Sequence, residues 1–386
     1  MNAYETTVRL LDYCRQQDWA GYDPYDALNS KVFQATVLRK SRLARLVFVQ
    51  LMKRSPVNLR PALLVPVMHN PKGTALFLSA VVRLRKAGLL ANDGDIEDLC
   101  NRLVGQCSAG QPHSCWGYSF DWQQRVNLVT KGTPNIICTT FAGHALLDAQ
   151  DLYGNDRFMG VCRSASDFLI DLLYYEEDAG TACFSYTPRE RAPVHNANLL
   201  GAAFLCRVSR ASGDERLALP ALKAARFSVS RQRPDGSWFY GESKTQRWID
   251  NFHTGFNLCA LHSIGEDAGV AEFDDSIRRG LEYFIGHFFC SDGAPRYFHN
   301  ATFPIDSHSV AQSIITLLTL RQLDDRAEPL AQAVFRWAVA NMVDPTGFFY
   351  YQKHCCYTVK IPYMRWSEAW MLLALSTLLK GETDSQ

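Results

Sequence analysis

The sequence has no excess of charge of either sign. Forty Lys and Arg residues against 39 Asp and Glu residues give the 386-residue chain a formal net charge of +1. A protein that holds nucleic acid needs surplus positive charge to replace the counterions of the phosphate backbone. We therefore expect no nucleic-acid partner.

The sequence also lacks an apolar run long enough to cross a bilayer. Such a span needs about 20 apolar residues, and the longest runs here, such as residues 61–68 and 369–379, are shorter or interrupted. Residues 1–11 carry an early Glu and no apolar segment of the kind found in secretory signals. We expect a protein with no transmembrane segment that works in the cytoplasm.

No C-x-x-C pair occurs among the twelve cysteines. That spacing is typical of zinc sites and redox motifs, and a chain of this length does not need disulfides to build a core. An H-E-x-x-H sequence, which places metal ligands on one helix face, is also missing. The prediction is a protein without a bound metal and without another cofactor.

What the sequence does contain is an internal repeat. Short segments that open helices recur at intervals of 55 to 60 residues, and their anchors are Asn135, His195, His253, His308 and Trp366. A period in this range with two helices per unit is typical of helical repeat architectures. The first helix of each unit is apolar nearly all round, which predicts burial on every side. The second helix is amphipathic, which predicts one face in contact with solvent.

Buried first helices alternating with half-exposed second helices describe two concentric rings. The sixth first helix, within residues 366–379, has no partner after it, and the helical pattern of residues 3–16 can supply one. We therefore predict an all-α fold, an (α/α)6 toroid of six hairpins closed by the N-terminal helix. It would form a single domain of residues 1–386, with residues 19–70 inserted over one end. An open superhelix, which normally serves as a binding scaffold, is the alternative.

Residues that open the inner helices of such a ring face the same mouth of the central cavity. Helix capping can explain any one of them, but a set this rich in imidazole and carboxylate groups favours acid–base chemistry. The predicted catalytic residues are His195, Tyr240, Glu242, Asp250, His253, His308, Arg365 and Glu368.

Aromatic rings beside polar side chains are suited to binding sugars, because a sugar face pairs C–H patches with hydroxyl edges. The repeat turns are rich in such rings, and amides recur at the helix starts. The predicted substrate-binding residues are Trp116, Trp122, Asn135, Asn196, Asn198, Trp238, Trp248, Asn257, Asp306, Tyr363 and Trp366.

Two resemblances bear on function. The string QRPDGSW at residues 232–238 resembles the Gln-x-x-x-Gly-x-Trp repeat of squalene and triterpene cyclases, where the motif is structural; their Asp-x-Asp-Asp acid motif is absent here. A closer resemblance is to the toroid proteins of bacterial exopolysaccharide and lipopolysaccharide gene clusters, which are grouped with six-hairpin glycosidase-like folds. It is carried by CWGYSFDWQ (115–123), KGTPNIICTTFAGHALLDA (131–149), VHNANLLGAAFL (194–205), DGSWFYGE (235–242), WIDNFHTGFNL (248–258), FPIDSHSVAQ (303–312) and KIPYMRWSEAWMLLAL (360–375).

The closer resemblance implies a part in making or tailoring a surface polysaccharide, with a carbohydrate or a lipid- or nucleotide-linked sugar as substrate and other biosynthetic enzymes as partners. Three mechanisms stay open. The number of carboxylates and tryptophans slightly favours hydrolysis through Glu242, Asp250 or Glu368. Epimerisation would use two histidines on opposite faces of the sugar, as toroidal sugar 2-epimerases do by resemblance. Elimination from a uronic acid would use Tyr240 with a histidine, and Arg365 against the carboxylate. There are two alternatives to a carbohydrate-active enzyme. One is a non-catalytic scaffold that binds glycan or a partner, and the other is a terpene cyclase-like enzyme.

Overall fold

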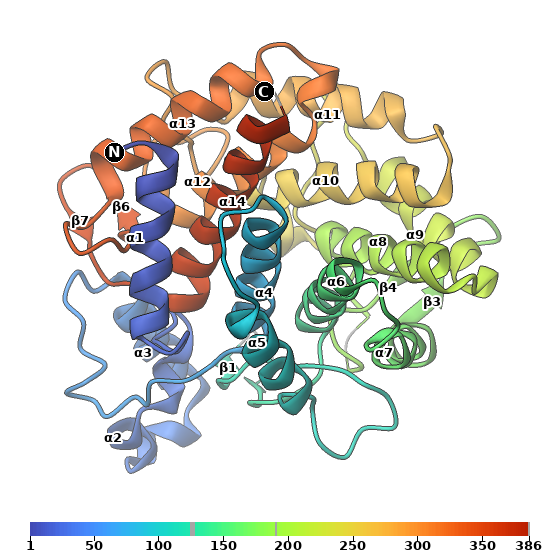
Figure 1. The fold of residues 1–386 in the computed structure, drawn as a ribbon. Coiled ribbons are helices and arrows are strands. Elements are labelled where there is room, and N and C mark those ends of the chain that lie inside the picture. Colours follow the sequence, from blue (N-terminus) through green and yellow to red (C-terminus); the bar gives the residue numbers. More distant parts are fainter. Residues whose placement is uncertain (124–127, 190, 385–386) are drawn as a thin grey trace.

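Six helices form a closed inner ring (Figure 1). The computed structural model describes residues 1–123, 128–189 and 191–384, with side chains up to residue 380. Each inner helix packs on the next, and the last packs back on the first. The inner helices are α4 (Pro71–Lys86), α6 (Ile136–Tyr153), α8 (His195–Ser212), α10 (Asn251–Ala268), α12 (Ser307–Thr319) and α14 (Ala369–Asp384).

A second set of helices surrounds this ring, one against each inner helix. Five of them follow their partners in the chain: α5 (Gly94–Gly105), α7 (Met159–Leu172), α9 (Ala218–Ser230), α11 (Asp274–His287) and α13 (Ala327–Met342). The sixth is the N-terminal helix α1 (Ala3–Gln16), which packs on α14. The predicted (α/α)6 toroid, closed between the two ends of the chain, is confirmed.

The two rings follow from the two helix patterns. Every residue of α12 up to Leu318 is buried, whereas α11 buries Ile277, Leu281 and Phe284 on one side only. Small residues let the inner helices approach one another. A Cβ atom at Gly143 of α6 would lie 2.2 Å from the Phe204 ring of α8, so a larger residue there would force the two helices apart.

The Gln-x-x-x-Gly-x-Trp string joins neighbouring hairpins. The Gln232 side-chain amide donates to the backbone oxygens of Gly236 and Ser276, each at 2.9 Å. The Trp238 indole N–H donates to the backbone oxygen of Ser228 at 2.9 Å. Gly236 has φ +88°, and a Cβ there would meet the Arg279 backbone oxygen at 2.2 Å. The motif is therefore a structural joint between α9 and α11.

Short elements fill the connections between the long helices. Two antiparallel pairs are β1 (Trp122–Gln123) with β2 (Leu128–Val129) and β3 (Tyr174–Glu176) with β4 (Ala182–Phe184); a three-stranded sheet has the order β5 (Ile305–Asp306), β6 (Gln352–Lys353), β7 (Thr358–Val359). Single turns of helix are η3 (Glu215–Leu217), η4 (Lys244–Gln246), η5 (Arg321–Leu323) and the π-helical η6 (Met364–Glu368), which leads into α14. None of the described helices has the length and apolar character needed to cross a membrane.

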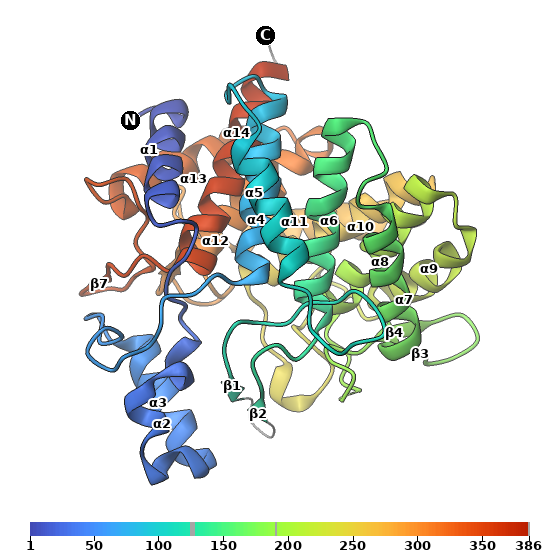
Figure 2. The same cartoon turned by 60° about the horizontal axis from the view of Figure 1, so that its bottom comes forward.

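Most of residues 19–70 project from one side of the ring, near strands β1 and β2 (Figure 2). They form η1 (Asp26–Asn29), α2 (Lys31–Gln34), η2 (Val37–Lys40) and α3 (Arg42–Arg54), around a small apolar core of their own that contains Phe33, Val49 and Met52. The interpretation of this segment as an insertion in one domain of residues 1–386 stays a prediction.

Candidate active site

A cavity of about 630 Å³ opens where the inner helices begin. Its walls are mainly aromatic, and they also carry the imidazoles of His253 and His308 and the cationic groups of Lys53, Lys72 and Arg365. No Asp or Glu of the described residues lines it. Eight of the predicted site residues do: Trp122, Asn196, Tyr240, Trp248, His253, His308, Arg365 and Trp366.

His253 reaches the cavity with a carboxylate behind it. Asp250 is the N-cap of α10, and its Oδ1 accepts the backbone N–H of His253 at 3.0 Å. Its Oδ2 accepts from the ring Nδ1 of His253 at 2.7 Å and from the Trp248 indole N–H at 2.8 Å. An ionised carboxylate only accepts hydrogen bonds, so Nδ1 carries the proton and Nε2 holds a lone pair. The pair has the form of a general base with a buried orienting acid.

His308 is a neutral imidazole held between rings. Its ring stacks on Phe252 and on Trp370, each at 4.4 Å between centroids. Burial, together with the positive charge of Lys72, holds the pKa of His308 well below its usual value. Neither ring nitrogen has a hydrogen-bond partner in the described residues. Because a buried unpartnered nitrogen is unfavourable, this imidazole is suited to bond a ligand in the cavity.

The ammonium group of Lys72 is surrounded by aromatic rings. Its ammonium nitrogen is 4.6 Å from the Phe141 centroid, 5.1 Å from that of Trp370 and 5.7 Å from that of Phe256. No acidic side chain of the described residues pairs with it. Burial, and then the charge of Arg365, lower the pKa of Lys72 to about 7.

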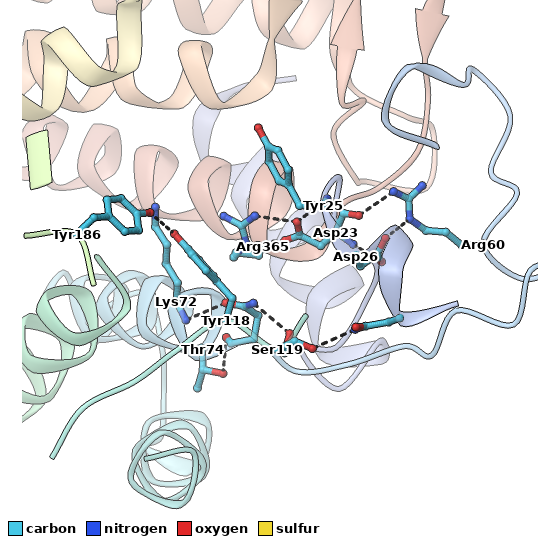
Figure 3. Close-up of polar contacts among 12 residues, drawn as sticks. Asp23, Tyr25, Asp26, Arg60, Lys72, Thr74, Tyr118, Ser119, Tyr186 and Arg365 are labelled. Carbon is cyan, nitrogen blue, oxygen red and sulfur yellow. Dashed lines mark hydrogen bonds and ion pairs between the residues drawn. The ribbon is translucent and has the colours of Figure 1, made fainter. Parts of the chain in front are cut away.

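Arg365 is fixed by a bidentate ion pair. Its guanidinium donates to both carboxylate oxygens of Asp23, at 2.5 and 2.8 Å. Figure 3 shows Asp23 and Asp26 between Arg365 on one side and Arg60 on the other, with Lys72 beside Tyr118. Burial opposes the charge of Arg365, but the Asp23 carboxylate outweighs it and raises the pKa of the guanidinium. This pair ties the 19–70 segment to the turn that opens α14.

His195 points away from the cavity, unlike the other two histidines of the repeat. It is the first residue of α8, whereas His253 is the third of α10 and His308 the second of α12. Its ring faces Ser228 of α9 at 3.2 Å and Glu242 at 2.9 Å. Its neighbour Asn196, the second residue of α8 as His308 is of α12, lines the cavity instead.

The predicted carboxylates other than Asp250 are also engaged outside the cavity lining. The hydrogen bond from His195 lowers the pKa of Glu242. Glu368 is buried and accepts the backbone N–H of Phe349 at 2.9 Å, and burial raises its pKa well above the usual value. Asp306 caps α12 and accepts the Trp366 indole N–H at 2.9 Å. Asp250 does not line the cavity, whereas His253 and Trp248, which donate to it, do.

The remaining predicted residues support the walls without lining the cavity. The Trp116 indole donates to the Leu103 backbone oxygen at 2.8 Å, as Trp238 does to Ser228. Asn135 is the N-cap of α6. The other three are buried: Asn198 bonds the Phe184 N–H at 3.0 Å and the Ala224 oxygen at 2.7 Å, Tyr363 accepts from Arg60 at 2.7 Å, and Asn257 lies inside α10.

Several lining residues are absent from the predicted set. Lys72 is the second residue of α4, as His308 is the second residue of α12, so its position in the repeat could have identified it. Tyr118 and Tyr186 lie in the aromatic turns, and their hydroxyls are 3.1 Å apart. Tyr25 and Lys53, joined at 2.8 Å, belong to the segment outside the repeat, where no periodic argument applies. The described ranges contain no group of three His, Cys, Asp or Glu side chains able to hold a metal ion.

The sequence matches no family profile and no curated protein. Among solved structures, a cellobiose 2-epimerase from Bacillus thermoamylovorans B4167 is 11% identical with a TM-score of 0.64, over 81% of this chain and 89% of that one. An unsaturated glucuronyl hydrolase specific for heparin is 12% identical with a TM-score of 0.65, over 100% and 97%.

A third similar structure is the glycoside hydrolase family 76 mannosidase Bt3792 from Bacteroides thetaiotaomicron, 12% identical with a TM-score of 0.59, over 82% of this chain and 88% of that one. The fold is the six-hairpin (α/α)6 toroid. At these identities the likeness establishes the fold of this toroid and leaves its chemistry to its own residues.

Replacing Lys72 by Met is expected to stabilise this toroid at pH 6. At that pH Lys72 carries its proton in both the folded and the unfolded chain, so folding must bury its positive charge. As the pH rises from about 7, the folded state loses that proton while an unfolded lysine keeps it up to about 10.4. The advantage of the variant in free energy of unfolding should therefore shrink between pH 7 and pH 10.

Urea denaturation at pH 6, 8 and 10 measures this effect. Lys86 is exposed at the end of the same helix, so Lys86→Met is the matched control and should show no such trend. A Lys72→Met variant that is less stable than the unchanged protein at pH 6 would show that the buried ammonium has a favourable partner.

Proposed function

We propose that this protein is a carbohydrate-active enzyme that moves a proton at a sugar carbon, as an epimerase or a lyase does. The observation that carries the proposal is the Asp250–His253 pair, joined at 2.7 Å, facing a cavity whose described lining has no carboxylate. His253 Nε2 would take a proton from a carbon next to a carbonyl or carboxylate group. For epimerisation, a second acid on the other face, such as the Lys72 ammonium group of the cavity, would then supply a proton there. For elimination, the electron pair left on the carbon would expel a leaving group.

Hydrolysis is less well supported than proton transfer. Glycosidases of the usual kind need two carboxyl groups that flank the scissile bond, one to protonate the leaving oxygen. Here Asp250 is covered by His253 and Trp248, Glu242 is bonded to His195, and Glu368 is buried behind Phe349. None of the three faces the space that a glycosidic bond would occupy.

The cationic groups of the cavity suit the charge that such a reaction develops. Removing a proton beside a carbonyl or carboxylate places negative charge on oxygen, and fixed cations in a dry site stabilise it. Lys72 and Arg365 would serve this role, and neutral His308 would hydrogen bond the sugar. The names of the similar structures, a sugar epimerase and an enzyme for unsaturated glucuronyl groups, are consistent with sugar substrates.

The resemblance to polysaccharide gene-cluster proteins supports a narrower proposal. The substrate would be a sugar unit of a bacterial surface polysaccharide, handled in the cytoplasm with other biosynthetic enzymes as partners.

Hydrogen exchange in D₂O tests the proposed reaction. We expect the protein, incubated with a panel of neutral and uronic sugars, to replace one carbon-bound hydrogen by deuterium in an accepted sugar, as measured by NMR. Release of reducing ends without exchange would identify a hydrolase. Binding without either change would identify a scaffold, and both results would contradict the proposal.

A further inference from the structure

The surface of the 19–70 segment is unusually apolar for a solvent-facing region. Ten of the 19 exposed large apolar side chains of the described residues lie between Val32 and Val67. In α3 the side chains of Leu43, Val47 and Leu51 are 71%, 49% and 65% exposed. They are four residues apart, so they share one face of the helix.

The same surface carries only positive charge. Residues 27–92 contain no Asp or Glu, while residues 31–60 contain eight Lys and Arg residues. Arg45, Lys53 and Arg60 bond within the protein, to Gln123, Tyr25 and Asp26. The other five are exposed, and no described acidic side chain pairs with them: Lys31, Arg39, Lys40, Arg42 and Arg54.

We propose that this face, comprising η2 and the exposed side of α3, docks on the surface of an anionic lipid membrane. A helix with basic residues and exposed leucines lies in the interface of such membranes, where the apolar side chains enter the lipid boundary and the cations meet the headgroups. A second copy of the chain is disfavoured because two such faces would repel each other. Nucleic acid would use the cations but leave the apolar side chains unpaired.

The docking face borders the cavity. Leu46, Gln50 and Lys53 of α3 line the cavity, and the exposed Leu43, Val47 and Leu51 lie on the adjoining side of the same helix. In Figure 2, α2 and α3 stand on the side of the ring where β1 and β2 lie, and β1 carries the cavity residue Trp122. Docking would therefore set the mouth beside the membrane, which suits a sugar carried on a lipid; that extension rests on the proposed function.

Vesicle sedimentation tests the docking itself, without any sugar. We expect the protein to bind vesicles of phosphatidylglycerol and phosphatidylcholine, to release them in high salt, and to bind pure phosphatidylcholine far more weakly. The triple variant Arg39→Gln, Lys40→Gln, Arg42→Gln should bind about 100-fold more weakly. The variant Leu43→Gln, Val47→Gln, Leu51→Gln should also lose binding. The changed side chains are exposed, and thermal unfolding checks that both variants stay folded.

A charge-matched control changes exposed cations elsewhere on the ring: Lys86→Gln, Arg278→Gln, Arg336→Gln. This variant should bind anionic vesicles as the unchanged protein does. Equal losses of binding in the control and in the two docking-face variants would overturn the proposal. The proposal would also fall if the unchanged protein does not bind vesicles but binds DNA or itself, and the docking-face substitutions abolish that binding.

Discussion

Replacing His253 by Gln is expected to lower the rate of carbon-bound hydrogen exchange by about 1,000-fold, within the range found for loss of a general acid–base residue. His253 is the imidazole that both faces the cavity and has a buried carboxylate at 2.7 Å behind it. Glutamine keeps a polar side chain of similar reach but cannot act as a general base. NMR of the sugar in D₂O measures the rate.

The variant Asp250→Asn tests whether Asp250 positions His253, while leaving the folding of α10 undisturbed. Asparagine is also a good N-cap, so its Oδ1 can keep the bond to the His253 backbone N–H and α10 should stay intact. The Asp250 carboxylate that accepts from His253 Nδ1 is lost, which disfavours the tautomer with a free Nε2. Exchange should therefore fall by at least about 100-fold. Circular dichroism should be unchanged.

Glu242→Gln is the matched control for these variants. Its carboxylate lies outside the cavity lining, against His195, so the rate should stay close to that of the unchanged protein. Loss of exchange in Glu242→Gln together with full activity in His253→Gln would mean that the wrong histidine has been assigned.

Replacing Asp23 by Ala is expected to lower the free energy of unfolding by about 3–5 kcal/mol, because it leaves the buried guanidinium of Arg365 without its counter-charge. Asp23 holds the 19–70 segment against the turn that opens α14, so the loss should appear in the stability of the ring. Urea denaturation measures it.

Two companion variants make this result specific. Arg226 and Glu272 form an ion pair at the surface, so Glu272→Ala should lower stability by about 1 kcal/mol or less. The double variant Asp23→Ala, Arg365→Met removes both buried charges and should recover most of the loss. A loss for Asp23→Ala no larger than that for Glu272→Ala would show that Arg365 does not depend on its partner.

The fold could be predicted because its signals are local and repeated. Each hairpin pairs an apolar helix with an amphipathic one, and the residues 3–16 pattern completes a count of six. The direction of a side chain at a helix start is harder to predict, because it depends on the contacts that the particular hairpin offers. His253 and His308 reach the cavity, whereas His195, at the first position of α8, turns toward α9.

The rest of the candidate site depends on contacts between residues that the sequence repeat does not relate to one another. Asp23 pairs with Arg365 across 342 positions of the chain, and Tyr25 and Lys53 come from the segment outside the repeat. Carboxylates near the rim suggested hydrolysis, but their number does not reveal that each is engaged by a neighbour. Only their three-dimensional partners separate Asp250, which orients a base, from Glu368, which is buried against a backbone N–H.

A crystal structure with an accepted sugar would show whether His253 acts as the base. We expect density in the cavity, with one sugar carbon about 3–3.5 Å from His253 Nε2 and an oxygen on the adjacent carbon directed toward Lys72 or Arg365. A sugar bound only outside this cavity, or one whose glycosidic oxygen lies between two carboxylates, would rule out proton transfer by His253.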